Sequence, residues 1–266
     1  HGLRLRKSLG QHFLADANVL ERIVEAIAPK AEEVAVEVGA GIGTLTVALA
    51  PHVRTLWAVE IDARLIPILQ AHLTPFPNVH VLQKDFLDVD LRSLGTDLLI
   101  VGNLPYGITS DVLLKLIRER ESVARAVLTV QWEVGAKLVA PPGPSVTRLG
   151  LHLRTYFEVE LLRRLPKTAF FPPPEVDGAL IRLRKLPEPR VSLPEEAWER
   201  TLALAFSQRR KTLRRVLMSV LPSAQVDRLL AELGLSPKVR AETLDFPELE
   251  RLGQALARLG ILSPHP

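Results

Sequence analysis

Residues 34–44 read VAVEVGAGIGT, so that a short apolar run passes directly into a segment with three glycines. The run 34–38 is typical of a buried strand, and the glycines predict a tight turn over which the backbone can approach a ligand closely. In a parallel sheet, turns of this kind lie at the carboxyl edge, where small molecules bind. The dinucleotide fingerprint places its third glycine one position later, where Thr44 stands, so an NAD site fits poorly.

On either side of this stretch, strand patterns alternate with helix patterns. Strands are predicted at residues 34–38, 55–61, 79–83, 97–101 and 126–131, and helices at residues 16–28, 62–73, 110–118, 132–139 and 146–156, with an apolar segment at 45–50. Asp16 and Asp62 are the expected N-caps of the helices that follow them. Apolar strands separated by helices imply an α/β fold with parallel pairing and both faces of the sheet covered. Two later strand patterns, 158–165 and 178–186, have only a loop between them, and we expect them to pair antiparallel at the sheet edge.

The sequence changes character at residues 187–189, which read PEP. Beyond this point the apolar period is helical throughout, and helices are predicted at residues 195–206, 208–220, 224–233 and 247–259. We therefore expect two domains, an α/β domain over residues 1–186 and a small all-helical domain over residues 187–266.

The composition is that of a folded globular protein, since 47% of the 266 residues are hydrophobic and 24% are charged. The chain has no run of about 18 uncharged apolar residues, and its basic start resembles no secretory signal. We therefore expect a cytoplasmic location without membrane contact. The absence of cysteine excludes disulfides, thiolate metal sites and cysteine nucleophiles. None of the seven histidines shows ligand spacing with another, so no metal site is predicted.

Acidic residues stand at the ends of the next two predicted strands. Glu60 lies 21 positions after Gly39, where a carboxylate can accept both ribose hydroxyls of a nucleoside ligand. The glycine turn and Glu60 together favour a nucleoside cofactor without a pyrophosphate. Asp85 ends the following strand, where it can accept a hydrogen bond from an adenine amino group or can simply cap a turn.

The fourth strand pattern runs into GNLPYG at residues 102–107, the most specific motif in the chain. This order of residues suits a planar exocyclic amine that undergoes methylation. Because the amine lone pair is delocalised into the purine, oxygen acceptors from Asn103 and the main chain favour a pyramidal nitrogen and stabilise developing positive charge. Tyr106 can stack on the base, and Pro105 fixes the turn. The alternative interpretation is a tight turn before a capped helix.

Basic residues form two local patches on a chain whose net charge is only +4. The first patch comprises Arg4, Arg6 and Lys7. The second comprises Arg209, Arg210, Lys211, Arg214 and Arg215, on the helix predicted at residues 208–220. The second patch is interpreted either as a solvated helix face or as a set of phosphate contacts that hold structured RNA.

Taken in order, these motifs resemble the ribosomal RNA adenine dimethyltransferase family across essentially all 266 residues. The resemblance is carried by residues 7–14, 37–43, 59–62, 84–86 and 103–106, and by the later stretches 170–177 (FFPPPEVD) and 208–213 (QRRKTL). The two later stretches separate this family from methyltransferases in general. The chain departs from the family pattern at His12, where asparagine is usual, and at Gly178, where serine is frequent.

The resemblance implies a Rossmann-like methyltransferase domain that binds S-adenosylmethionine and leaves S-adenosylhomocysteine. It assigns the cofactor to His12, Leu14, Gly39, Glu60, Asp85 and Asn103. It assigns the target base to Asn103, Leu104, Pro105, Tyr106 and Phe171, with Phe170 as the neighbouring alternative to Phe171. Stacking of the base on Tyr106 and Phe171, at about 1–3 kcal/mol per base, would offset the few kcal/mol that base extrusion costs.

The implied activity is dimethylation at N6 of two adjacent adenosines in the 3′-terminal hairpin loop of 16S ribosomal RNA, during small-subunit biogenesis. The implied partner is 16S RNA or the immature 30S subunit, bound by a monomer. One alternative is a 23S RNA adenine methyltransferase of the macrolide-resistance type, and another is a non-catalytic ribosome-assembly or transcription factor with the same fold. The stretches 170–177 and 208–213 favour the small-subunit activity, and the intact cofactor motifs favour catalysis.

Overall fold

A computed structural model describes residues 12–208 and 210–262 of the chain. The basic patch Arg4, Arg6 and Lys7 lies outside the described residues, as does Arg209 of the predicted RNA contacts. The chain divides into two compact units. The first unit comprises residues 1–136 and 157–186, and the second comprises residues 137–156 and 187–266.

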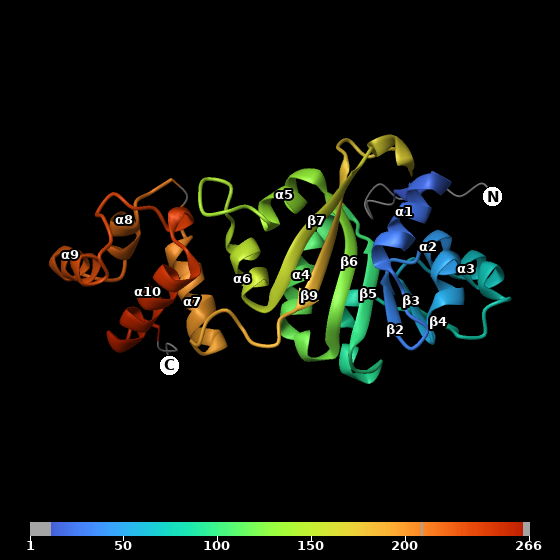
Figure 1. Ribbon diagram of the computed structural model, residues 1–266, viewed down its shortest axis with the longest axis horizontal. Coiled ribbons are helices and arrows are strands. Elements are labelled where there is room, and N and C mark those ends of the chain that lie inside the picture. The colour runs from blue at the N-terminus through green and yellow to red at the C-terminus, as the bar shows by residue number, and fades with distance from the viewer. Residues whose placement is uncertain (1–11, 209, 263–266) are drawn as a thin grey trace. The chain divides into compact units, whose positions relative to one another are not determined.

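The first unit is built on a seven-stranded sheet with the strand order β4-β3-β2-β5-β6-β9-β7. The strands are β2 (Val34–Val38), β3 (Thr55–Glu60), β4 (Val79–Gln83), β5 (Leu98–Asn103), β6 (Val123–Gln131), β7 (Phe157–Leu165) and β9 (Gly178–Lys185). Strands β2 to β6 pair in parallel, whereas β9 pairs antiparallel with both β6 and β7. Figure 1 shows β5, β6, β9 and β7 side by side. The predicted α/β fold, with its antiparallel sheet edge, is confirmed.

Helices precede and connect the parallel strands of this unit. They are α1 (Ala17–Ile27), α2 (Thr44–Leu49), α3 (Ile66–Leu73), α4 (Thr109–Arg118) and α5 (Trp132–Leu138), with the 3-10 turns η2 (Ala50–His52), η3 (Phe86–Asp88), η4 (Leu91–Ser93), η5 (Tyr106–Ile108), η6 (Arg120–Ser122) and η7 (Lys167–Ala169). Asp16 caps α1 as predicted, since its carboxylate accepts the main-chain N–H groups of Asn18 and Val19. The prediction for Asp62 is wrong, because its carboxylate pairs with Arg64 and α3 begins only at Ile66.

A two-stranded sheet ties the start of the described chain to the loop before β9. Its strands, β1 (Phe13–Leu14) and β8 (Phe170–Phe171), pair antiparallel, with Phe13 opposite Phe171 and Leu14 opposite Phe170. Leu14 and Phe170 are buried in one hydrophobic cluster with residues of α1, β2 and β5. Two segments that are far apart in sequence therefore meet beside the carboxyl ends of the parallel strands.

The second unit is helical, as predicted for the C-terminal part of the chain. Its elements are α6 (Arg148–Tyr156), α7 (Glu195–Ala205), α8 (Leu213–Leu217), α9 (Ser223–Glu232), η8 (Ala241–Thr243) and α10 (Phe246–Arg258). Trp198 is fully buried in the core of this unit, and its indole N–H donates to the Thr155 hydroxyl at 2.8 Å. This contact explains why residues 137–156, which the sequence analysis placed in the first domain, group with the second unit. Among the described residues, no helix combines the length and the apolar character that a membrane crossing requires.

The helix predicted at residues 208–220 is much shorter in the structure. Helix α8 begins only at Leu213, because the Thr212 hydroxyl accepts the main-chain N–H of Arg215 and caps the first turn. Arg210 has a left-handed backbone conformation, with φ at 66°, which a continuous helix does not allow. Arg210 and Lys211 therefore lie in the turn that precedes α8.

Candidate functional site

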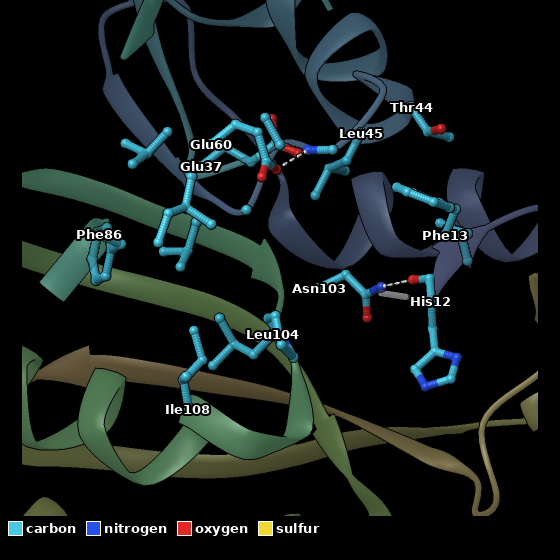
Figure 2. A pocket seen from close by; sticks show the side chains of 18 of the residues that line it. His12, Phe13, Glu37, Thr44, Leu45, Glu60, Phe86, Asn103, Leu104 and Ile108 are labelled. Atoms are coloured by element: carbon cyan, nitrogen blue, oxygen red, sulfur yellow. Dashed lines mark hydrogen bonds between the residues drawn. The ribbon is translucent and has the colours of Figure 1, made fainter. Parts of the chain in front are cut away.

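A cavity of about 430 Å³ lies at the carboxyl ends of β2, β3, β4 and β5 (Figure 2). It is lined by residues of the glycine turn, of the acidic strand ends, of the segment after β5 and of the β1–β8 sheet. All six predicted cofactor residues line it, namely His12, Leu14, Gly39, Glu60, Asp85 and Asn103. Four of the five predicted target-base residues also line it, namely Asn103, Leu104, Pro105 and Tyr106.

The glycine turn needs glycine for two different physical reasons. All three of its glycines have positive φ angles, 71° at Gly39, 60° at Gly41 and 90° at Gly43, which L side chains rarely adopt. At Gly39 a Cβ would meet no atom within 4 Å, because this glycine faces the open cavity. At Gly41 a Cβ would stand 2.9 Å from the ring of Phe13, so the bare backbone there admits the N-terminal segment.

Glu60 is buried at the end of β3, and its carboxylate is hydrogen-bonded to the glycine turn. One carboxylate oxygen accepts the main-chain N–H of Gly41 at 2.7 Å, and the other accepts that of Asp62 at 2.8 Å. A carboxylate oxygen has two lone pairs, so each Glu60 oxygen can accept a further hydrogen bond from a ligand. Figure 2 shows the carboxylate of Glu60 beside the turn.

The structure is consistent with both interpretations of Asp85, as the cap of a turn and as an acceptor for a ligand. One oxygen of its carboxylate accepts the main-chain N–H of Leu87 at 2.9 Å and caps the turn η3. The residue also lines the cavity. The capping bond fixes the side chain, and the second oxygen keeps its capacity to accept from a ligand.

Asn103 ends β5, and its side chain is oriented by the N-terminal segment. Its amide nitrogen donates to the main-chain oxygen of His12 at 2.6 Å, as the dashed line in Figure 2 shows. The carboxamide oxygen is thereby left as the acceptor of this side chain. The main-chain N–H of the next residue, Leu104, donates to the Thr129 oxygen on β6, and the Leu104 side chain is buried. The turn after β5 is therefore held on both sides.

Tyr106 and His12 stand beside the loop that leads into β9. The two rings are 5.9 Å apart between centroids. The His12 Nδ1–H donates to the Pro172 oxygen at 2.7 Å, and the Tyr106 hydroxyl donates to the Val176 oxygen at 3.5 Å. Burial, and to a smaller extent the charge of Asp177, raises the pKa of Tyr106 above its usual value. The tyrosine is therefore neutral at physiological pH and can act as an uncharged stacking surface.

Phe171 is the one predicted target-base residue that does not line the cavity. It is 66% exposed, whereas its neighbour Phe170 is 4% exposed and lines the cavity wall. Side chains alternate along β8, so one phenylalanine is buried and the next faces solvent. The assignment of Phe171 to the target base stays a prediction.

Sequence reasoning passed over several residues that line the cavity. Glu37 is almost fully buried on β2 and accepts the Thr46 hydroxyl at 2.6 Å. Burial, which outweighs the hydrogen bond from Thr46, raises the pKa of Glu37 to about 8. Ile61, which is 51% exposed, and Phe86, which is buried, also line the cavity. A charge inside an apolar strand and an aliphatic residue directly after an acidic strand end were the available signals.

The basic residues predicted to contact RNA are not equivalent in the structure. Arg214 on α8 makes a two-pronged ion pair with Asp227, with N–O distances of 2.6 and 3.0 Å. Arg210, Lys211 and Arg215 are exposed. The exposed cations are therefore more accessible to a phosphate group than Arg214, whose guanidinium is already paired with a carboxylate.

Comparison with solved structures places this geometry among known folds. A dimethyladenosine transferase of Plasmodium falciparum superposes with a TM-score of 0.81 over 94% of this chain and 99% of that one, at 23% identity. The 23S rRNA methyltransferase ErmE superposes with a TM-score of 0.74 over 92% of this chain and 99% of its own, at 28% identity. The fold, the glycine turn and the acidic strand ends define a Rossmann-like methyltransferase.

The family model described as ribosomal RNA adenine dimethylase matches residues 2–256, and the chain belongs to this family. The ribosomal RNA small subunit methyltransferase A of Bacillus mycoides (strain KBAB4) is 42% identical over 96% of this chain and 92% of that protein. The protein of the same name from Bacillus cereus (strain B4264) has the same identity and coverage. The small-subunit relatives favour the first activity considered from the sequence over the 23S alternative.

Proposed function

We propose that this protein dimethylates N6 of two adjacent adenosines near the 3′ end of 16S ribosomal RNA, with S-adenosylmethionine as the methyl donor. The orientation of Asn103 carries the proposal, because its amide nitrogen is held by His12 and its oxygen is the group left to accept from an amine. The family match and the names of the small-subunit relatives support the RNA substrate.

The residues that line the cavity fit S-adenosylmethionine. The space beside Gly39 is open, so a ligand can lie directly against the backbone there. A Cβ at this position would occupy that space. Glu60 has acceptor capacity for ribose hydroxyls, and Asp85 has it for an adenine amino group. His12 and Leu14 contribute from the N-terminal segment. When bound, the cofactor supplies a methyl group on a positively charged sulfur, which is already activated toward attack.

The protein contributes alignment and electrostatic support to the transfer. The Asn103 oxygen accepts an N–H of the target amine, which favours a pyramidal nitrogen and stabilises the positive charge that develops on it. Pro105 fixes the turn, and Tyr106 with Phe171 stacks on the extruded base. The site holds the amine nitrogen in line with the methyl group, which lowers the entropic part of the barrier to transfer. The nitrogen becomes acidic once it has gained a carbon, so its proton passes to water without a strongly basic side chain.

The partner we propose is 16S RNA within an immature 30S subunit, bound by a protein monomer in the cytoplasm. Arg209, Arg210, Lys211, Arg214 and Arg215 are the proposed phosphate contacts. An arginine fork suits a phosphate group, and a helical unit with exposed cations suits structured RNA. Because Arg214 already pairs with Asp227, we assign the larger share of contacts to the exposed members of this patch.

Mass mapping of methylated nucleotides tests the proposed function. Unmodified 30S particles, 50S particles and free 16S RNA are incubated with the protein and isotopically labelled S-adenosylmethionine. We expect two neighbouring dimethyladenosines near the 3′ end of 16S RNA, and none in 50S particles. Asn103→Ala is expected to retain the fold and the RNA affinity and to lose most of the methyl transfer. Label in 23S RNA, or no label in any RNA, would contradict the proposal.

A further inference from the structure

Helix α4 carries a buried cation outside the cavity. Lys115 is only 3% exposed, and its Nζ donates to the Val89 oxygen at 2.5 Å and pairs with the carboxylate of Glu119 one turn further along. The other oxygen of Glu119 accepts the main-chain N–H of Leu91 at 2.8 Å. The Lys115 Nζ also lies 5.7 Å from the centre of the Phe86 ring.

Three of these contacts, those to Phe86, Val89 and Leu91, converge on one segment, residues 85–91, which lies in the connection between β4 and β5. Asp85 and Phe86 at its start line the cavity, and Val89 and Leu91 at its end are the residues that the pair holds. Figure 2 shows Phe86 on one side of the cavity and Asn103 with His12 on the other. Lys115 and Glu119 themselves do not line the cavity.

Helix α4 also begins directly after the turn that holds Asn103, because only η5 separates the two. The same helix therefore follows the Asn103–Tyr106 turn at its start and, through Lys115 and Glu119 at its end, is hydrogen-bonded to Val89 and Leu91 of the segment 85–91. This arrangement fixes the two sides of the cavity relative to each other within the first unit.

We propose that Lys115 and Glu119 are positioning residues that hold Asp85 and Phe86 against the nucleoside end of the cofactor. The proposal rests on the proposed function, since it takes the cavity as the cofactor site. Stability alone does not require the pair, because replacing a buried ion pair with apolar residues is often neutral or stabilising. A charged pair that bonds one carbonyl and one N–H of the same segment instead fixes where that segment lies.

The test measures the dissociation constant of S-adenosylhomocysteine by calorimetry, together with the melting temperature, on the whole chain. Lys115→Met leaves the Val89 oxygen without its donor, and we expect cofactor binding to weaken about tenfold. Glu119→Gln keeps an acceptor for Leu91 but removes the carboxylate charge that pairs with the buried ammonium of Lys115, and we expect a smaller weakening in the same direction. At saturating cofactor, the kcat and the RNA affinity of both variants stay within about twofold of the wild type.

A double variant, Lys115→Met with Glu119→Leu, separates positioning from stability. Removing both charges recovers the melting temperature, because no unpaired charge remains buried. Cofactor binding stays weak, because the segment 85–91 has lost its two bonds to α4. Recovery of cofactor affinity together with stability would overturn the inference.

The ion pair of Arg125 with Glu33 provides a matched control at the amino ends of the parallel strands. Arg125 bonds Glu33 at 2.8 Å and also bonds the main-chain oxygens of Ile27 and Ala28. We expect Arg125→Met to lower the melting temperature and to leave the cofactor dissociation constant within about twofold of the wild type. Equal loss of cofactor affinity in Arg125→Met and Lys115→Met would overturn the inference. Failure of the wild type itself to bind S-adenosylhomocysteine would instead overturn the proposed function.

Discussion

The side-chain nitrogen of Asn103 donates to the main-chain oxygen of His12 at 2.6 Å, although 91 positions of sequence separate the two residues. In a side-chain amide the nitrogen donates and the oxygen accepts, and this bond engages the nitrogen. The donor end is held by the N-terminal segment, so the acceptor end is available to an amine. The main-chain oxygen of residue 12 performs this role with any side chain at that position.

Asn103→Asp tests this orientation directly. The substitution keeps the shape of the side chain but places a second oxygen against the His12 oxygen, where the two acceptors repel. We expect kcat for methyl transfer to fall about 100-fold, with RNA affinity unchanged. Single-turnover methyl transfer, followed by mass spectrometry, measures the effect. His12→Asn retains the main-chain acceptor and is expected to lose far less activity, and equal losses in the two variants would contradict the interpretation.

Phe170 and Phe171 are neighbours with opposite environments, which makes them a matched pair for the target-base prediction. Phe171→Ala removes an exposed ring, so we expect an unchanged melting temperature and a loss of about 10- to 100-fold in kcat/KM for RNA, from the stacking of one base. Phe170→Ala empties a buried site and is expected to lower stability by about 3–5 kcal/mol. Thermal unfolding and steady-state kinetics together separate these effects. A large activity loss confined to Phe170→Ala would reassign the base contact to that residue.

The strands of the sheet could be predicted closely because glycines, prolines and charges bound each apolar run. The predicted strands 34–38 and 79–83 coincide with β2 and β4. The helix at 208–220 could not be predicted, since its apolar period continues through a turn that Arg210 and the Thr212 cap create. Neither the composition nor the spacing of apolar residues indicates a left-handed backbone conformation at Arg210.

The acidic and amide residues of the site were predictable for a topological reason. Glu60 and Asn103 each end a strand and Asp85 follows one, and the carboxyl ends of parallel strands meet at one edge of the sheet. Contacts between remote segments were not predictable in this way. Lys115 has the sequence context of a surface lysine on an amphipathic helix, and only the packing of residues 85–91 against α4 buries it.

Glu37 makes the stability of the protein depend on pH in a defined direction. Burial raises its pKa to about 8 from an ordinary value of 4.5, so the folded protein keeps a proton that the unfolded chain releases. The stabilisation is complete below about pH 4.5 and is lost as pH rises through about 8. We expect Glu37→Gln, which cannot ionise, to lose less melting temperature than the wild type between pH 6 and pH 9. If the melting temperatures of the two proteins changed equally with pH, Glu37 would already be ionised in the folded protein.

Arg214 and Arg215 are adjacent on α8, yet we expect them to contribute differently to RNA binding. Arg215 is exposed, so Arg215→Ala is expected to reduce the slope of log affinity against log salt by about 0.7–0.9, the value for one phosphate contact. The guanidinium of Arg214 is already paired with Asp227, so the charge-neutral double variant Arg214→Ala with Asp227→Ala is expected to reduce the slope by less than Arg215→Ala does. Filter binding to 30S particles over a range of potassium chloride concentrations measures both slopes. Equal reductions would show that Arg214 exchanges its carboxylate partner for a phosphate when RNA binds.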